Sequence, residues 1–107
     1  MGAERISAED LLTRIESGAA PVILDVRSRA EFATGHVPGA RHVPFWRMSK
    51  LVRELPISRD SEVVVYCGHG PRALIAAQAL RRRGFTRVTY LEGHFSKWRS
   101  AGLREET

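Results

Sequence analysis

Short apolar runs alternate along the chain with stretches whose apolar positions recur every three or four residues. The runs at 22–26, 62–66 and 87–91 are rich in Val, Ile and Leu, as expected for strands buried in a parallel sheet. The stretches between them have the periodicity of helices. Strands that alternate with helices predict an α/β fold with a mostly parallel sheet.

Capping residues predict where two helices begin. Ser7 precedes an apolar stripe at helical spacing, so a helix is expected from there to about Gly18. Ser28 and Glu31 form a capping-box pattern, which predicts a short helix that ends near Gly35.

The remaining elements follow from proline, glycine and apolar spacing. Residues 41–44 can form only a short strand, because a proline ends it. Further helices are expected at 45–55, at 71–83 and at 95–101, the last with Trp98 as its anchor.

Length and composition fit one domain over residues 1–107. A hydrophobic content of 43% and a charged content of 27% are ordinary for a globular protein, so disorder is expected only at 104–107.

Charge and hydropathy predict neither a nucleic-acid nor a membrane partner. The net charge is +5, but the basic residues are scattered and cluster only at 81–83. The apolar runs are far shorter than the ~20 residues of a membrane span. Early acidic residues and the absence of an apolar run near the N-terminus argue against a signal peptide, so a cytoplasmic location is expected.

The only cysteine follows a predicted strand, at the edge where open parallel sheets bind ligands. It begins a segment that joins this strand to a helix, Cys67-Gly68-His69-Gly70-Pro71-Arg72. The glycines allow backbone N–H groups to turn inward, and the helix dipole and Arg72 add positive potential. Such a cradle favours a thiolate and would also hold a persulfide anion. The alternative is a small buried side chain beside a tight turn, which would need no such loop.

Three groups of residues resemble the signatures of the rhodanese family, and they occur in the family's order over nearly the whole chain. The first group is Leu24-Asp25-Val26-Arg27, Glu31-Phe32 and Gly35-His36-Val37-Pro38-Gly39-Ala40. The second is the segment from Cys67 to Arg72. The third is Leu91-Glu92-Gly93 with Trp98 and Gly102.

The resemblance implies a three-layer rhodanese-like domain with a five-stranded parallel sheet flanked by helices. It implies a thiosulfate sulfurtransferase that moves sulfane sulfur from thiosulfate or a similar donor to cyanide or a thiol, and a protein thiol is a further candidate acceptor. The catalytic residue would be Cys67, and the substrate-binding residues would be Gly68, His69, Gly70, Pro71 and Arg72. We expect no cofactor and no metal.

The histidines outside this segment need separate interpretation. His94 stands where the family often has a second glycine, and it would lie at the mouth of the site. It would either affect the choice of acceptor or be a substitution tolerated in a surface turn. His36 and His42 lack a Cys or carboxylate at metal-ligand spacing, so they do not predict a metal site.

Several residues near the site are expected to be scaffold. Arg27 and Glu31 are four positions apart and could form an ion pair. Asp25 could accept hydrogen bonds from backbone amides at the end of its strand. Phe45 and Trp46 would either line the pocket or take part in ordinary helix packing.

Two other functions remain open. Phosphatases and arsenate reductases of the Cys-x5-Arg type use a similar thiolate cradle, but this chain has one residue fewer between Cys67 and Arg72. The second alternative is a rhodanese-like binding module without turnover, although inactive members of the family commonly lack the cysteine.

Overall fold

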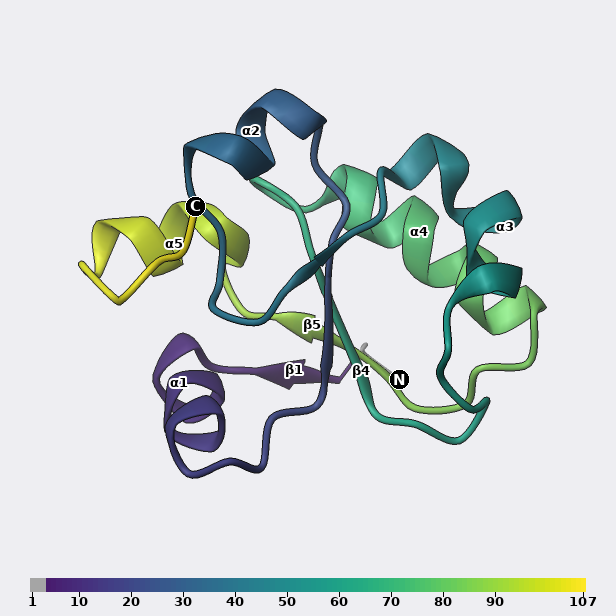
Figure 1. Cartoon of the computed structure of the whole chain (residues 1–107), viewed down its shortest axis with the longest axis horizontal. Coiled ribbons are helices and arrows are strands. Elements are labelled where there is room, and N and C mark those ends of the chain that lie inside the picture. The colour runs from purple at the N-terminus through teal and green to yellow at the C-terminus, as the bar shows by residue number, and fades with distance from the viewer. Residues whose placement is uncertain (1–3) are drawn as a thin grey trace.

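Five parallel strands form one sheet, in the order β1-β5-β4-β2-β3 (Figure 1). The computed structural model describes residues 4–107. The strands are β1 (Arg5–Ile6), β2 (Val22–Asp25), β3 (Arg41–His42), β4 (Val63–Tyr66) and β5 (Val88–Leu91). The predicted α/β fold with a parallel sheet is therefore confirmed. The sequence pattern did not predict β1, because two residues are too few to show a period.

Helices cover both faces of the sheet and make a three-layer arrangement (Figure 1). One face packs against α1 (Ala8–Glu16) and α5 (His94–Ser100). The other face packs against α3 (Met48–Leu51) and α4 (Pro71–Arg82), and α2 (Arg29–Thr34) follows the end of β2. Among residues 4–107, no helix combines the length and the hydrophobicity needed to cross a bilayer.

Strand β4 lies at the centre of the molecule and contributes to both cores. It pairs with β2 on one side and β5 on the other, and all four of its residues are buried. Val63 and Val65 face the core under α3 and α4, whereas Val64 and Tyr66 face the core under α1 and α5. This alternation follows the two-residue period of a strand, and it explains why the run is apolar throughout.

The expected helix at 45–55 is not continuous. It consists of a 3-10 turn (Phe45–Arg47), one turn of α-helix (α3) and a second 3-10 turn (Val52–Glu54). No side chain caps the first of these turns or α3, and tighter 3-10 bonds satisfy the backbone groups at such ends. Met48 and Val52 are both buried, so the apolar spacing correctly predicted the face but not the regularity of the segment.

The predicted helix starts are confirmed. The hydroxyl of Ser7 accepts from the N–H of Asp10 at 3.0 Å. The capping box forms in both directions between Ser28 and Glu31.

The expected disorder at 104–107 is wrong. Glu106 and His36 exchange two backbone hydrogen bonds of 2.8 and 2.9 Å. The indole N–H of Trp98, which is fully buried, donates to the carbonyl oxygen of Arg104. Hydrogen bonds to the segment after α2 and to α5 thus hold the last residues in place.

Candidate active site

Cys67 lies directly after β4 and begins the loop that leads into α4. Its side chain is fully buried, and the N–H of Gly70 donates a hydrogen bond to its Sγ with an N···S distance of 2.9 Å. Gly70 has φ 138°, which L side chains rarely adopt, so this turn requires a glycine. The loop therefore directs the Gly70 amide at the sulfur atom, where it would stabilise negative charge.

The backbone of this loop is attached to the start of α5. The carbonyl oxygen of Cys67 accepts from the N–H of Phe95 at 3.0 Å, and that of Gly68 accepts from the N–H of Ser96 at 3.2 Å. The N–H of Cys67 donates to Nδ1 of His94 at 3.3 Å. Three hydrogen bonds thus fix the position of the loop relative to the sheet.

Arg72 lies in the first turn of α4, and its planar side chain pairs with Glu31 of α2. The two N–H···O distances are 2.6 and 3.1 Å. These hydrogen bonds lower the pKa of Glu31 to about 2, and they raise the pKa of Arg72. Gly68 is close to this pair, because a Cβ on it would lie 3.1 Å from a nitrogen of Arg72. Arg72 thus borders the loop while holding α2 against it.

The predicted ion pair between Arg27 and Glu31 is wrong. Arg27 is buried and pairs with the buried carboxylate of Asp25 at 2.7 Å, whereas the carboxylate of Glu31 pairs with Arg72. Burial acts to lower the pKa of Arg27, but the hydrogen bonds and charge of Asp25 outweigh it and raise the pKa. The expected role of Asp25 is confirmed, since its Oδ1 accepts from the backbone N–H of Arg27 at 3.0 Å.

Tyr66 completes this buried group beneath the loop. Its hydroxyl donates to Asp25 at 2.7 Å and accepts from the N–H of Val37 at 3.0 Å. Burial, followed by the negative charge of Asp25, raises the pKa of Tyr66, so the hydroxyl remains protonated and can donate. Because Tyr66 immediately precedes Cys67, this network fixes the end of β4 from which the loop begins.

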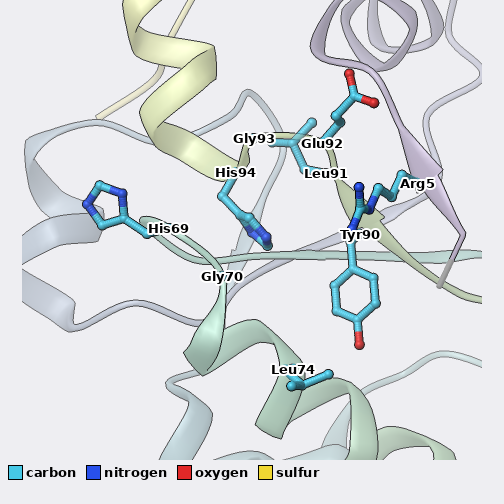
Figure 2. Close-up of a pocket in the computed structure, with 9 residues that line it drawn as sticks. All are labelled: Arg5, His69, Gly70, Leu74, Tyr90, Leu91, Glu92, Gly93 and His94. Atoms are coloured by element: carbon cyan, nitrogen blue, oxygen red, sulfur yellow. The ribbon is translucent and has the colours of Figure 1, made fainter. Parts of the chain in front are cut away.

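A cavity of about 400 Å³ lies beside the loop (Figure 2). Its lining comes from β1, the loop, α4 and the end of β5: Arg5, His69, Gly70, Leu74, Tyr90, Leu91, Glu92, Gly93 and His94. The position predicted for His94, at the mouth of the site, agrees with this lining. Phe45 and Trp46 do not belong to it. Phe45 packs against the core, and Trp46 is 60% exposed on a different surface.

Comparison with known proteins identifies the family of the chain. The family model for the rhodanese-like domain matches residues 7–101. The chain belongs to the rhodanese-like domain family. A thiosulfate sulfurtransferase of Pseudomonas fluorescens, GlpE, is 35% identical over 97 residues, which are 91% of this chain and 85% of that protein.

Two further relatives show how far the similarity extends. The human single-domain sulfurtransferase TSTD1 has a solved structure with a TM-score of 0.81 and 29% identity, which covers 92% of this chain and 97% of that one. The uncharacterized protein YqhL of Bacillus subtilis is 40% identical over 76 residues, or 71% of this chain. The match spans only 59% of YqhL, so YqhL is the longer protein.

The structure brings together the predicted site residues of this rhodanese-like domain. Cys67, Gly68 and Gly70 form the turn at the sulfur atom, Pro71 is the first residue of α4, and His69 is exposed beside the cavity. Sequence reasoning did not predict that Glu31 is the partner of Arg72, which lies 41 positions away. It also did not predict that Arg5 and Tyr90 line the cavity, because only the pairing of β1 with β5 brings them together.

Proposed function

We propose that the protein is a sulfurtransferase that carries sulfane sulfur as a persulfide on Cys67. The observation that carries this proposal is the hydrogen bond from the Gly70 amide to Sγ, within a glycine-containing turn at the end of a buried parallel strand. An amide directed at a sulfur atom lowers the free energy of its anionic form. The relatives named as sulfurtransferases, with which the chain shares its fold and about a third of its residues, support the same reaction class.

The reaction has two displacement steps. The thiolate of Cys67 attacks the outer sulfur of thiosulfate, the S–S bond of thiosulfate breaks, and sulfite leaves with the electron pair. The resulting Cys67 persulfide anion is then attacked at its outer sulfur by cyanide or by a thiolate. The bond to Sγ breaks and its electron pair returns to Cys67, while thiocyanate or the acceptor persulfide leaves. Neither step consumes an oxidant, a reductant or a cofactor.

We assign binding of the transferred sulfur and of the donor to the loop around Cys67, that is to Gly68, His69, Gly70, Pro71 and Arg72. Amides of the loop would receive the negative charge in both states of the enzyme, because the persulfide anion is only one bond longer than the thiolate. Exposed His69 would meet incoming substrate first. Arg72 would supply positive charge from the side of α2.

The pairing of Arg72 disfavours a phosphatase or an arsenate reductase. In the Cys-x5-Arg type of site the arginine binds the oxyanion, which requires its planar set of donors to be free. Here both terminal nitrogens of the guanidinium donate to Glu31, and the loop is one residue shorter. Sulfur transfer needs no such fork, because the group transferred is a single atom.

Steady-state formation of thiocyanate from thiosulfate and cyanide tests the proposal. The wild-type protein should turn over, and Cys67→Ser should be inactive while retaining the circular dichroism spectrum of the wild type. Hydrolysis of an aryl phosphate by the wild type would support the phosphatase instead. A folded wild type that turns over neither substrate would support the binding module without turnover.

Two further features remain predictions. We propose that residues 1–107 make up a single rhodanese domain and that the protein acts in the cytoplasm. Limited proteolysis and fractionation of the producing cells would test them.

A further inference from the structure

His94 has an unusual backbone conformation at the edge of the cavity. Among residues 4–107 it is the one residue other than glycine with a positive φ, at 53°. Histidine tolerates this region better than most residues, but the conformation is uncommon and tends to occur at functional sites. It follows Gly93, which has φ 73°, so two successive left-handed residues turn the chain from β5 into α5. The turn directs the imidazole back toward the loop (Figure 2).

The hydrogen bond between His94 and the backbone of Cys67 determines the tautomer of the imidazole ring. Nδ1 accepts from the N–H of Cys67, so the neutral ring carries its proton on Nε2. Burial, followed by the electrostatic effects of Arg5 and His69, lowers the pKa of His94, which favours the neutral ring. Nε2 lies against Gly70, where a Cβ would be 3.4 Å away. His94 therefore presents an N–H donor beside the loop.

Positive charge predominates around this donor. Arg5 comes from β1, and its side chain forms no ion pair or hydrogen bond with any other residue in 4–107. Glu92 also lines the cavity, but it pairs with Lys97 at 3.3 Å. His69 adds a further imidazole on the opposite wall (Figure 2). A negatively charged ligand group would thus find, on neighbouring walls, an imidazole N–H and a guanidinium that has no partner within residues 4–107.

Tyr90 forms a largely buried part of the cavity wall. The residue lines the cavity and is only 7% exposed. Its hydroxyl oxygen is buried and has no hydrogen-bond partner within the part of the chain that the structure describes. In Figure 2 this hydroxyl points away from Arg5, toward the side of Leu74.

We propose that this cavity binds the sulfur acceptor, as a small thiol with a carboxylate group that Arg5 and Nε2–H of His94 hold. The proposal rests on the proposed function, because it names the acceptor of the same Cys67 persulfide. The cavity volume of about 400 Å³ lies in the range of about 300–1,000 Å³ that organic ligands occupy. It therefore suits an organic thiol better than the diatomic cyanide ion. Gly70 belongs both to the cavity and to the turn at Sγ, so an acceptor bound here lies next to the loop.

The transfer step balances without further reactants. The acceptor loses its thiol proton to solvent and attacks the outer sulfur of the Cys67 persulfide as a thiolate. A new S–S bond forms on the acceptor, and the bond between the outer sulfur and Sγ breaks. The electron pair of that bond stays on Sγ, which accepts the Gly70 hydrogen bond again.

The test compares two thiols that differ in the carboxylate alone, 3-mercaptopropionate and 3-mercaptopropan-1-ol, with thiosulfate as donor. For the wild type we expect kcat/KM to be about tenfold higher for the carboxylate, the effect of one charged hydrogen-bonded contact. Arg5→Gln and His94→Asn should each reduce this ratio, and asparagine is chosen because it tolerates a positive φ. Arg53→Gln removes an exposed charge away from the cavity and should leave the ratio unchanged.

Equal rates for the two thiols in the wild type would overturn the proposal. The Arg5→Gln variant could also overturn the proposal. If its KM for thiosulfate rises while the ratio of kcat/KM for the two thiols stays the same, Arg5 binds the donor and not the acceptor. The mass of the protein after thiosulfate treatment shows separately whether the persulfide has formed. If the persulfide forms but transfers its sulfur to both thiols at the same rate, this inference is contradicted and the proposed function is not.

A binding measurement keeps the inference testable even if turnover fails. The unreactive thioethers 3-(methylthio)propionate and 3-(methylthio)propan-1-ol are titrated into Cys67→Ser, and the side-chain NMR signals of His94 and Tyr90 are followed. We expect saturable shifts with the carboxylate only, and their loss in Cys67→Ser/Arg5→Gln. Absence of shifts with the carboxylate, or the same affinity for both thioethers, would contradict the inference.

Discussion

The guanidinium of Arg72 and the carboxylate of Glu31 form two hydrogen bonds, of 2.6 and 3.1 Å, that join the first turn of α4 to α2. Glu31 also completes the capping box of α2 by accepting from the N–H of Ser28 at 2.9 Å. One carboxylate thus caps the start of α2 and braces the loop that follows Cys67. Because the donors of Arg72 are used in this way, its contribution to catalysis should depend on Glu31.

Substitutions at Arg72 should therefore lower kcat/KM for thiosulfate in a graded order. Arg72→Ala removes a strong charged contact, and we expect a loss of ~2 kcal/mol, about thirtyfold. Arg72→Lys keeps the charge but cannot pair through a planar fork, so its loss should be intermediate. Arg82→Ala, an exposed change in the same helix, is the matched control and should have little effect.

A double substitution tests whether Arg72 acts through Glu31. Glu31→Gln should lower kcat/KM less than Arg72→Ala, and the double variant should be no worse than Arg72→Ala alone. Additive losses would show instead that the two side chains act independently.

The same pair should make stability depend on acid pH. The pKa of Glu31 is lowered from 4.5 to about 2 by its hydrogen bonds with Arg72, so the stabilisation is fully present above pH 4.5 and is lost as the pH falls toward about 2. Urea unfolding should show wild type more stable than Glu31→Gln at pH 7, with the difference shrinking below pH 4.5. Solvent screens this pair, whose side chains are 29% and 38% exposed, so the difference at pH 7 should be below ~1 kcal/mol.

The matched control for this pH dependence is Glu16→Gln, an exposed change at the end of α1. It should show no such convergence with the wild type. A Glu31→Gln difference that stays constant down to pH 2 would mean that the carboxylate does not carry the effect.

The buried group around Asp25 should be far more sensitive to substitution. Arg27→Met leaves the Asp25 carboxylate without its cation in a fully buried position, and breaking such a pair costs about 3–5 kcal/mol. Tyr66→Phe removes one donor to Asp25 and one acceptor for Val37, with an expected cost of about 1–3 kcal/mol. Urea denaturation at neutral pH gives both values, and a smaller loss for Arg27→Met than for Tyr66→Phe would contradict this ranking.

The sequence correctly predicted those structural features that are determined by residues a few positions apart. The apolar run of β4, the capping box of Ser28 and Glu31 and the glycine turn after Cys67 each act within a few positions, and each is present in the structure. The segment at 45–55 was predicted as too regular, because apolar spacing defines the buried face and not the hydrogen-bond pattern of each turn.

The partners of charged residues could not be predicted in this way. Arg27 had two carboxylates within reach, Asp25 and Glu31, and spacing alone favoured the pair four positions apart. In the folded chain β2 buries Asp25 together with Arg27, while α2 places Glu31 opposite Arg72. Likewise, Arg5 and His94 line the same cavity only because β1 pairs with β5, and no local pattern in the sequence predicts that pairing.

Mass spectrometry of the intact protein after incubation with thiosulfate tests the central claim most directly. The account predicts that the wild type gains the mass of one sulfur atom, that cyanide removes it, and that Cys67→Ser gains nothing under the same conditions. A folded wild type that gains no sulfur, or a Cys67→Ser variant that still does, would contradict a persulfide on Cys67.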